Sequence, residues 1–297
     1  MELTKPKISE ENMVVNLTPL GLGPWSFSKL KCLKKCPFQF YLKYVLKVKP
    51  AITVEVTLDT LVGKAAHRII EVLLASKGKT LKEVYDYVRK EYPSFSDEEW
   101  EEHLVGVEYN ITRFKERLDE FAATTPVKRF LQELRIGVTK EYTPTTFFGD
   151  DVWFRGIIDL AVQLANGDVI FIDHKYGVPI EAGIRNNKEQ LDTYKVLYHY
   201  GIEKISGSQS GVHFIKAGDM LLGEYSSRSE IENSLRPRLE HSLNCAVDNL
   251  KEIGYFKHIA GNQCKWCEFN EPCKAKEFIT MEKETKKWFK IKEITNV

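Results

Sequence analysis

The stretch GIIDLAVQLANGDVIFIDHK, residues 156–175, contains the features that decide the fold. It predicts two β-strands joined at Asn166-Gly167, a pair typical of tight hairpin turns. Side chains alternate between the two faces of a strand, so Asp173 and Lys175 should point to one face and His174 to the other. The hairpin therefore presents an acid and a lysine side by side, which is a pattern with chemical consequences.

A second acid, Asp159, lies on the first strand of this hairpin. With a two-residue turn, Ala165 pairs with Asp168 and Leu160 with Asp173, which leaves Asp159 one residue out of register with Asp173. Two neighbouring carboxylates suit Mg²⁺ or Mn²⁺, which can activate a water molecule against a phosphodiester. A nearby lysine can orient that water or neutralise charge that develops on the phosphate. The alternative is a surface ion pair, since a lone Asp-x-Lys triplet is common.

The remaining pattern predicts a mixed α/β core with a helical N-terminal layer. Residues 26–47 have helical spacing that Pro37 interrupts, and Ser96 is a candidate N-terminal cap for the helix that begins at Asp97. The other expected helices and strands follow from periodicity. Helices are expected over 58–74, 81–90, 97–121, 186–200 and 229–253, and strands over 135–142, 152–164, 168–175 and 211–216.

Composition excludes several classes of protein. The 297 residues include 43 basic and 42 acidic side chains, so the chain is not a globally basic nucleic-acid coat. No stretch approaches the roughly 18–20 uninterrupted apolar residues of a membrane span, and Met1–Pro6 lacks the apolar core of a secretory signal. We therefore expect a cytoplasmic protein without membrane partners. A phosphate-binding Gly-x₄-Gly-Lys-(Ser/Thr) motif is also missing, so any unwinding of DNA must come from a helicase partner or from frayed ends.

Five motifs occur in an order that resembles the RecB-like branch of the PD-(D/E)xK nuclease superfamily, over residues 26–276. They are LVGKAAH ending at His67, an acid at Glu141 before the strands, GIID ending at Asp159, DHK at Asp173–Lys175, and QLDTY from Gln190 to Tyr194. The resemblance implies a restriction-endonuclease-like mixed sheet flanked by helices. It also implies that the metal is Mg²⁺ or Mn²⁺ and that the substrate is DNA.

The same resemblance assigns roles to single residues. His67, Asp159 and Asp173 would bind the metal, helped by the backbone carbonyl of His174. Lys175 would be the catalytic lysine, and we expect Glu141 to support the ligands from behind. Further site residues would lie one helical turn apart and face the substrate or the lysine, namely Gln190 and Tyr194.

Cysteines form a second pattern near the C-terminus. Three of the six cysteines, Cys264, Cys267 and Cys273, are spaced closely enough to share one metal centre, and Cys36 or Cys32 is the candidate fourth ligand. The segment CPFQFY that begins at Cys36 resembles the iron–sulfur members of this nuclease branch, which include the CRISPR-associated exonuclease family and AddB-type subunits. The resemblance implies a [4Fe–4S] cluster. A Cys₄ zinc site and unrelated buried cysteines are the alternatives.

Such a cluster would clamp the two ends of the chain together. We expect an N-terminal extension over 1–25, one nuclease domain over 26–276 with a helical insertion at about 77–130, and a basic tail over 277–297. The clamp would join residue 36 to residues 264–273. It would also bring the seven lysines of 28–49 close to Lys265 and Lys274. Interleaved aromatic residues, which could stack bases of a single strand, are Phe38, Phe40, Tyr41 and Trp266.

These patterns predict a metal-dependent DNA nuclease, as an exonuclease on free or single-stranded ends. The expected settings are recombination, repair, CRISPR or phage DNA metabolism, with a helicase, recombination or CRISPR protein as possible partner. One alternative is an iron–sulfur DNA-binding scaffold whose inactive nuclease site serves a partner. Another is a redox or zinc-dependent regulator in which the cysteines carry the function.

Overall fold

The computed structural model describes residues 24–45, 47–48, 58–76, 78–179 and 181–253, together with residues 259, 261, 264, 267–269 and 273. The chain divides into two compact units. The larger unit comprises residues 56–237, and the smaller unit comprises residues 1–55 and 238–297. The predicted N-terminal extension, apart from Pro24 and Trp25, and the predicted basic tail lie outside the described residues, as do Lys49, Lys265, Trp266 and Lys274.

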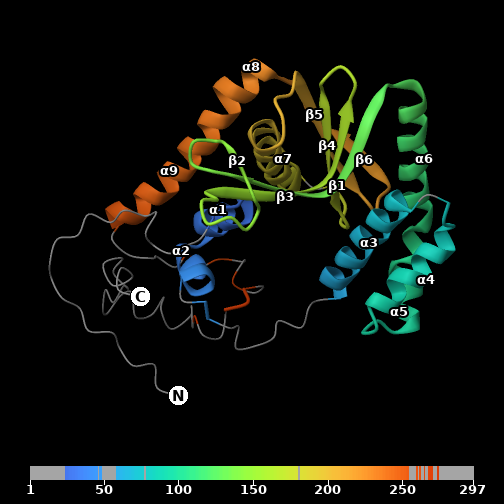
Figure 1. Cartoon of the computed structure of the whole chain (residues 1–297). Coiled ribbons are helices and arrows are strands. Elements are labelled where there is room, and N and C mark those ends of the chain that lie inside the picture. Colours follow the sequence, from blue (N-terminus) through green and yellow to red (C-terminus); the bar gives the residue numbers. More distant parts are fainter. Residues whose placement is uncertain are drawn as a thin grey trace. The chain divides into compact units, whose positions relative to one another are not determined.

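The larger unit is built on a mixed sheet of seven strands in the order β2-β1-β3-β4-β5-β6, with β7 paired to β5 (Figure 1). The strands are β1 (Val127–Val138), β2 (Pro144–Thr145), β3 (Phe154–Leu164), β4 (Val169–Lys175), β5 (Gly207–Phe214), β6 (Asp219–Leu222) and β7 (Ser226–Ser227). Only the β4–β5 pair is parallel among these pairs, and α7 (Glu181–Gly201) connects its two strands. A central mixed sheet with helices around it confirms the predicted fold class.

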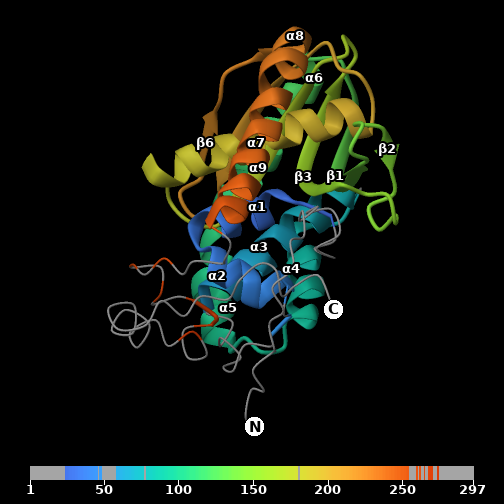
Figure 2. The ribbon, with the colours of Figure 1, turned by 90° about the vertical axis from the view of Figure 1, so that its left-hand side faces the viewer.

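Helices cover both faces of this sheet (Figures 1 and 2). A buried apolar cluster joins the helices before β1 to side chains of the central strands, among them Leu160, Val162 and Ile172. On the opposite face, the ring of Tyr198 on α7 lies 5.3 Å from the ring of Phe171 on β4. The helices of the first layer are α3 (Leu58–Ala75), α4 (Leu81–Glu91), α5 (Asp97–His103), the 3₁₀ turn η3 (Val105–Val107) and α6 (Glu108–Thr124).

Several predicted elements have other bounds in the structure, among them the helix expected over 97–121 and the strand expected over 135–142. The single helix expected over 97–121 is divided at Gly106, a poor helix former, into α5, η3 and α6. Its N-terminal cap is as predicted, because the Ser96 hydroxyl accepts a hydrogen bond from the Glu99 N–H. Strand β1 begins at Val127 rather than at Arg135, so the sheet contains eight residues of this strand that the sequence pattern did not indicate.

The hairpin between β3 and β4 has a three-residue loop, so the predicted two-residue turn was wrong. The Leu164 N–H donates to the Asp168 carbonyl at 2.9 Å, which closes the loop over residues 165–167. Gly167 takes a positive φ of +88°, whereas Asn166 does not. The Asn166 side chain instead accepts a hydrogen bond from the Asp168 N–H. A two-residue type I′ turn needs positive φ at both positions, so this local geometry selects the longer loop.

The longer loop shifts the register of the hairpin by one residue. Leu160 pairs with Ile172, where the two-residue turn would have paired it with Asp173. Continued by one residue, the observed register brings Asp159 opposite Asp173. The offset between the two acids that the shorter turn would have caused is therefore removed.

The smaller unit contains α1 (Phe27–Lys35), α2 (Pro37–Phe40), the π-helical turn η2 (Tyr41–Val45) and most of α9 (Arg236–Ile253). Pro37 interrupts the first helix as predicted: Cys36 is extended, with φ of −157°, and Pro37 begins α2. The larger unit ends with the short helix α8 (Arg228–Glu230) and the π-helical turn η4 (Ile231–Leu235). Within the described residues, no helix combines the length and the apolar character that a membrane span requires.

Candidate active site

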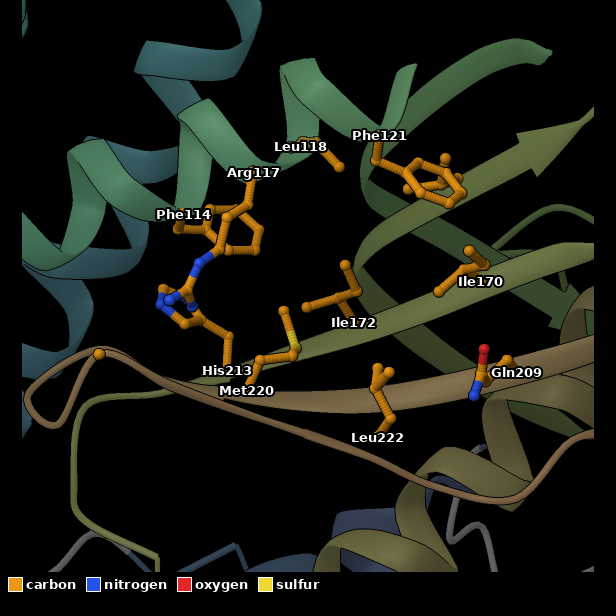
Figure 3. Close-up of a pocket in the computed structure, with 12 residues that line it drawn as sticks. Phe114, Arg117, Leu118, Phe121, Ile170, Ile172, Gln209, His213, Met220 and Leu222 are labelled. Atoms are coloured by element: carbon orange, nitrogen blue, oxygen red, sulfur yellow. The ribbon is translucent and has the colours of Figure 1, made fainter. Parts of the chain in front are cut away.

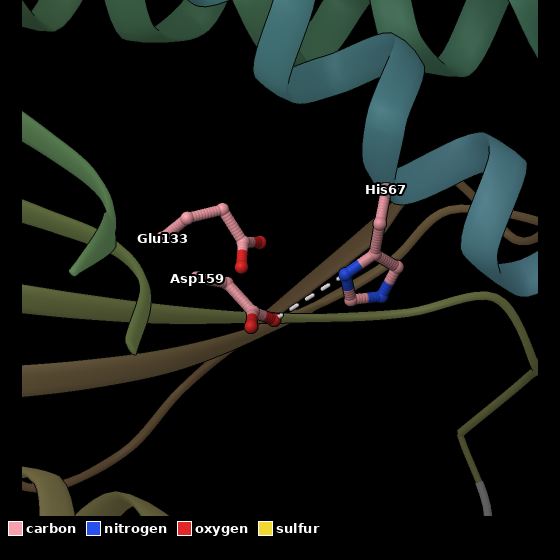
Figure 4. A group of neighbouring side chains, drawn as sticks. All are labelled: His67, Glu133 and Asp159. Carbon is pink, nitrogen blue, oxygen red and sulfur yellow. Dashed lines mark ion pairs between the residues drawn. The ribbon is translucent and has the colours of Figure 1, made fainter. Parts of the chain in front are cut away.

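Three possible metal ligands from three different elements meet above the sheet in the larger unit. One nitrogen of His67 on α3 and one carboxylate oxygen each of Glu133 on β1 and Asp159 on β3 all lie within 4.8 Å of one another. Figure 4 shows the three side chains converging, with the His67–Asp159 ion pair dashed. The Nδ1 atom of His67 is 3.7 Å from Oδ2 of Asp159. Imidazole nitrogen and carboxylate oxygen together suit a divalent cation such as Mn²⁺ or Mg²⁺.

The other predicted site residues form a connected chain next to this group. The Lys175 Nζ lies 2.7 Å from Oδ2 of Asp173, whose side chain is only 1% exposed. Gln190 on α7 donates to Oδ1 of Asp173 at 3.0 Å and also contacts the hydroxyl of Tyr194, one helical turn further along. The ion pair with Asp173 therefore holds Lys175, and the hydrogen bond from Gln190 holds Asp173.

Asp159 links the two groups through the backbone of β4. Its Oδ2 accepts a hydrogen bond from the His174 N–H at 2.8 Å. The paired residues of β3 and β4 end at Leu160 and Ile172. Beyond this point the His174 N–H donates to the Asp159 carboxylate in place of the backbone of β3. The structure therefore brings His67, Asp159, Asp173, Lys175, Gln190 and Tyr194 into one neighbourhood, in the larger unit alone.

Glu133 is the site residue that the motif comparison missed. The β1–β3 register pairs Gln132 with Leu160 and Leu134 with Ile158, so Glu133 falls opposite Asp159. Its backbone has φ of +45°, a left-handed conformation that is costly for a residue with a side chain and that clusters at functional sites. Glu141, the acid expected here, is exposed in the turn after β1. Extending the predicted strand to Val127 would have revealed that Glu133 lies across from Asp159.

The carboxylates of this site carry charge that the protein itself compensates poorly. Burial, followed by the charge of Asp159, raises the pKa of Glu133 to about 7. Burial also raises the pKa of Asp173 to about 6 against the opposing effect of Lys175, and it raises the pKa of Asp159. A bound divalent cation would supply the missing positive charge, so the residues present fit such an ion.

His67 is suited to be a neutral ligand. Burial and the charge of Lys175 lower its pKa below the ordinary value of 6.5. The imidazole is therefore uncharged at neutral pH, which leaves a nitrogen lone pair free for a metal.

The side chain of His174 lies on the other face of β4 from Asp173, where its ring meets that of His67 edge-on, with the centroids 5.8 Å apart. Its Nδ1 lies 3.0 Å from Nδ1 of His213 on β5, and its ring meets Phe114 of α6 edge-on, with the ring centroids 5.1 Å apart. Burial lowers the pKa of His174 well below its ordinary value, so the ring stays neutral and structural. Only the backbone of His174 faces the acids, as strand alternation predicts, and its carbonyl stays a predicted ligand.

A cavity of about 280 Å³ lies between α6 and strands β4 to β6 (Figure 3). Its walls are mainly apolar, with Arg117 and His213 at one end. None of the predicted metal ligands lines it. The cavity is thus separate from the acids, although His213 connects its wall to His174.

No disulfide joins the described cysteines of the smaller unit, and five of them interact electrostatically: Cys32, Cys36, Cys264, Cys267 and Cys273. Burial, followed by the charge of Cys36, raises the pKa of Cys273 to about 12, with smaller contributions from Cys267 and Cys264. Burial likewise raises the pKa of Cys32 to about 12. No three sulfur atoms among the described cysteines lie within 4.8 Å of one another.

Hydrogen bonds and one ion pair order the segments that carry these thiols. The Gln39 N–H donates to the Cys36 sulfur, and the Gly261 N–H donates to the Cys264 sulfur. The ion pair between Lys43 and Glu268, at 2.5 Å, joins the N-terminal and C-terminal segments of the unit.

The sequence matches a known protein family. Residues 24–274 match the profile of the PD-(D/E)XK nuclease superfamily. A crystal structure of a "Putative exonuclease" from Eubacterium rectale is 14% identical, with a TM-score of 0.44 over 82% of this chain and 88% of that chain. The crystal structure of SSO0001 is 13% identical, with a TM-score of 0.35 over 91% and 89%. No curated protein matches the sequence significantly. Because the family profile covers most of the chain, this protein belongs to the PD-(D/E)XK nuclease superfamily.

Proposed function

We propose that this protein is a Mg²⁺- or Mn²⁺-dependent deoxyribonuclease that acts as an exonuclease on free or single-stranded DNA ends. The observation that carries the proposal is the meeting of His67, Glu133 and Asp159 beside the Asp173–Lys175 ion pair. An acidic group of this kind next to a lysine has the components that phosphodiester hydrolysis requires.

Each residue has a defined task in this proposal. His67, Glu133, Asp159 and Asp173 would hold the metal, which when bound polarises the phosphate and helps to ionise the attacking water. Lys175, 36% exposed at its side chain, is placed to orient that water or to offset charge on the phosphate. Gln190 fixes the Asp173 carboxylate through a hydrogen bond and so keeps Lys175 at a constant position.

We further propose that Cys36, Cys264, Cys267 and Cys273 bind a [4Fe–4S] cluster. These four cysteines act electrostatically on one another, which supports their meeting at one site. A Cys₄ zinc site is the alternative to the cluster. Cys32 is the alternative fourth ligand.

The proposed biological setting is recombination, repair, CRISPR or phage DNA metabolism. The chain lacks a phosphate-binding motif of the helicase type, so a helicase or another recombination or CRISPR protein would supply unwound ends.

Cleavage of end-labelled DNA by anaerobically purified protein tests the nuclease proposal. We expect the wild type to shorten single-stranded or frayed DNA with Mg²⁺ or Mn²⁺ and to be inactive in EDTA. Lys175→Ala should reduce the cleavage rate at least a hundredfold, because a positioned charge at the reacting phosphate lowers the activation barrier by several kcal/mol. Lys188→Ala is the matched control, since Lys188 forms only an exposed ion pair with Glu224.

Two outcomes would contradict the proposal. Equal cleavage rates for the wild type and Lys175→Ala would contradict the assignment of this site. Tight DNA binding without cleavage in any metal would instead support an iron–sulfur DNA-binding scaffold whose nuclease site serves a partner.

A further inference from the structure

Two neighbouring aromatic residues lie on the loop between β2 and β3, in the larger unit: Phe148 is exposed and Phe147 is half-buried. The side chain of Phe148 is 73% exposed, and its ring meets that of Phe147 edge-on, with the centroids 4.9 Å apart. A single exposed phenylalanine is unremarkable on a protein surface. Phe148, however, lies beside a second phenylalanine and close to two arginines.

Two arginines from adjacent strands flank these rings. The guanidinium of Arg155 on β3 lies 4.7 Å from the Phe147 ring centroid and 5.5 Å from that of Phe148. It also donates a hydrogen bond to the Phe147 carbonyl, which fixes the loop. Arg135 on β1 lies 6.0 Å from the Phe147 centroid. Within the part of the chain that the structure describes, neither guanidinium has a carboxylate within 4 Å.

The strands place this group on the face of β1 and β3 opposite α7. Gly156 faces α7, since a Cβ at this position would lie 2.7 Å from Leu197. Alternation then directs Arg155 and Ile157 to the opposite face. Gly137 is level with Arg155 in the register and has no side chain, so the loop lies closely over it, with the Thr146 carbonyl 2.9 Å from where a Cβ would be.

The same two strands carry the acids further along. Along β3, Arg155 precedes Asp159 by four residues, which is roughly 13 Å of strand. Ile157, 36% exposed, lies between them. Arg135 lies two residues from Glu133 on β1, and its charge acts on that carboxylate. A strand of nucleic acid that reached from the rings to the acids would span roughly two to four nucleotides, since stacked nucleotides rise about 3.4 Å each.

We propose that Arg135, Phe147, Phe148 and Arg155 bind unpaired nucleotides of the substrate strand, a few nucleotides from the bond that is cut. The Phe148 ring offers its exposed face to a base, and the arginines attract the phosphates. Bases in a duplex are already stacked and paired, so this surface favours single-stranded over double-stranded ends. The inference deepens the proposed function and rests on it for the identity of the strand.

Charge distinguishes this occupant from an apolar protein partner. Neither arginine forms an ion pair with a carboxylate among the described residues, and an apolar partner would leave both uncompensated. Asp150 and Asp151 follow Phe148 in the same loop, so the phosphates must approach from the arginine side. The Asp151 carboxylate is already occupied by the Thr145 hydroxyl.

Binding of short labelled oligothymidylate in EDTA, where metal-dependent cleavage does not occur, tests the inference. We expect Phe148→Ala to weaken single-strand binding about tenfold, the loss of one stacked base, and to change duplex binding little. Tyr109→Ala is the matched control, because Tyr109 on α6 is 72% exposed. Phe148→Trp should keep the affinity and show fluorescence quenching by the oligonucleotide that Tyr109→Trp does not show.

Salt dependence tests the arginines separately. Arg135→Gln should reduce the slope of log affinity against log salt by about 0.7, the value for one phosphate contact of a single strand. The change should leave the Phe148→Trp quenching in place.

The outcomes separate this inference from the proposed function. Unchanged single-strand affinity in Phe148→Ala, or an equal loss for duplex, would overturn the inference even if the wild type cleaves DNA. If Phe148→Ala loses single-strand affinity but the wild type cleaves DNA in no metal, the result would support the binding surface and contradict the nuclease proposal. A wild type that binds no oligonucleotide, or binds one only through residues outside this surface, would overturn the inference as well.

Discussion

At the scale of single residues, the site is defined by carboxylates that are kept close together although they repel. Glu133 adopts a strained backbone conformation directly opposite Asp159, and Asp173 is almost fully buried beside Lys175. Such an arrangement is costly in the absence of a cation. It therefore predicts how stability, metal binding and catalysis respond to pH and to the loss of one acid.

Glu133→Gln should reduce cleavage about 10- to 100-fold, because a residue that binds or orients a catalytic metal typically contributes this much. The protein should remain folded, since the Glu133 side chain is partly exposed. Glu141→Gln is the matched control and should cleave like the wild type, because Glu141 is exposed in the turn. Initial rates with Mn²⁺ measure both variants. A loss of rate in Glu141→Gln alone would show that the wrong acid has been assigned.

The pKa values predict that metal stabilises the protein more at high pH than at low pH. In the folded state, the pKa of Asp173 is raised to about 6 and that of Glu133 to about 7, above their ordinary values of 3.8 and 4.5. The folded state without metal then binds more protons than the unfolded state, so the stability from these acids is present at low pH and is lost as pH rises through about 6 to 7.

Mn²⁺ replaces those protons, so the rise in Tm on adding Mn²⁺ should be larger at pH 7.5 than at pH 5.5. Thermal unfolding in EDTA and in Mn²⁺ at the two pH values measures this difference. Glu133→Gln should reduce it. A metal effect on Tm that is independent of pH would contradict the assignment of these acids as ligands.

At the scale of elements, the hairpin shows how far the sequence could predict the site. The strands, the position of the turn and the common face of Asp173 and Lys175 follow from alternation and from Asn166-Gly167, and the structure agrees. The register does not follow, because the same dipeptide serves two-residue and three-residue loops, and only the backbone decides between them. Glu133 was missed for a related reason: residues 127–134 lack a regular apolar alternation, and their place in the sheet depends on pairing with β3.

The hairpin register depends on one glycine. Gly167→Ala should destabilise the protein by about 1–2 kcal/mol, since Gly167 has φ of +88° and an added Cβ would lie 2.8 Å from the Ser206 hydroxyl. Cleavage should fall with it, because a change of register moves Asp159 relative to Asp173. Gly177→Ala is the matched control: this position has an ordinary φ and nothing within 4 Å of the added Cβ. Urea unfolding compares the two, and equal stability would show that the turn does not fix the register.

At the scale of the whole molecule, the candidate nuclease site and the proposed cysteine cluster belong to different compact units. The predicted metal ligands all belong to residues 56–237, whereas the cysteines proposed for the cluster belong to the unit formed by both ends of the chain. The sequence could indicate both sites because each depends on residue types at short spacing. It could not assign the fourth thiol, because Cys32 and Cys36 differ by one helical turn and only their surroundings distinguish them. Cys36, placed at the break before Pro37, influences Cys267 and Cys273, whereas Cys32 interacts with Cys36 and Cys267.

This division predicts that loss of the cluster affects the smaller unit before it affects the active site. Cys267→Ser should remove the absorbance near 400 nm expected of a [4Fe–4S] protein and should expose residues of the smaller unit to limited proteolysis. Residues 56–237 should stay protected, and Mn²⁺ should still raise their resistance to proteolysis. Cys245→Ser is the matched control, because Cys245 is exposed on α9, where its sulfur contacts only His241 among the described residues, and it should keep the absorbance. If the purified wild type contains stoichiometric zinc and no iron, the result would support the Cys₄ zinc site instead of the cluster. Proteolysis that begins within residues 56–237 of Cys267→Ser would show that the two units are not independent.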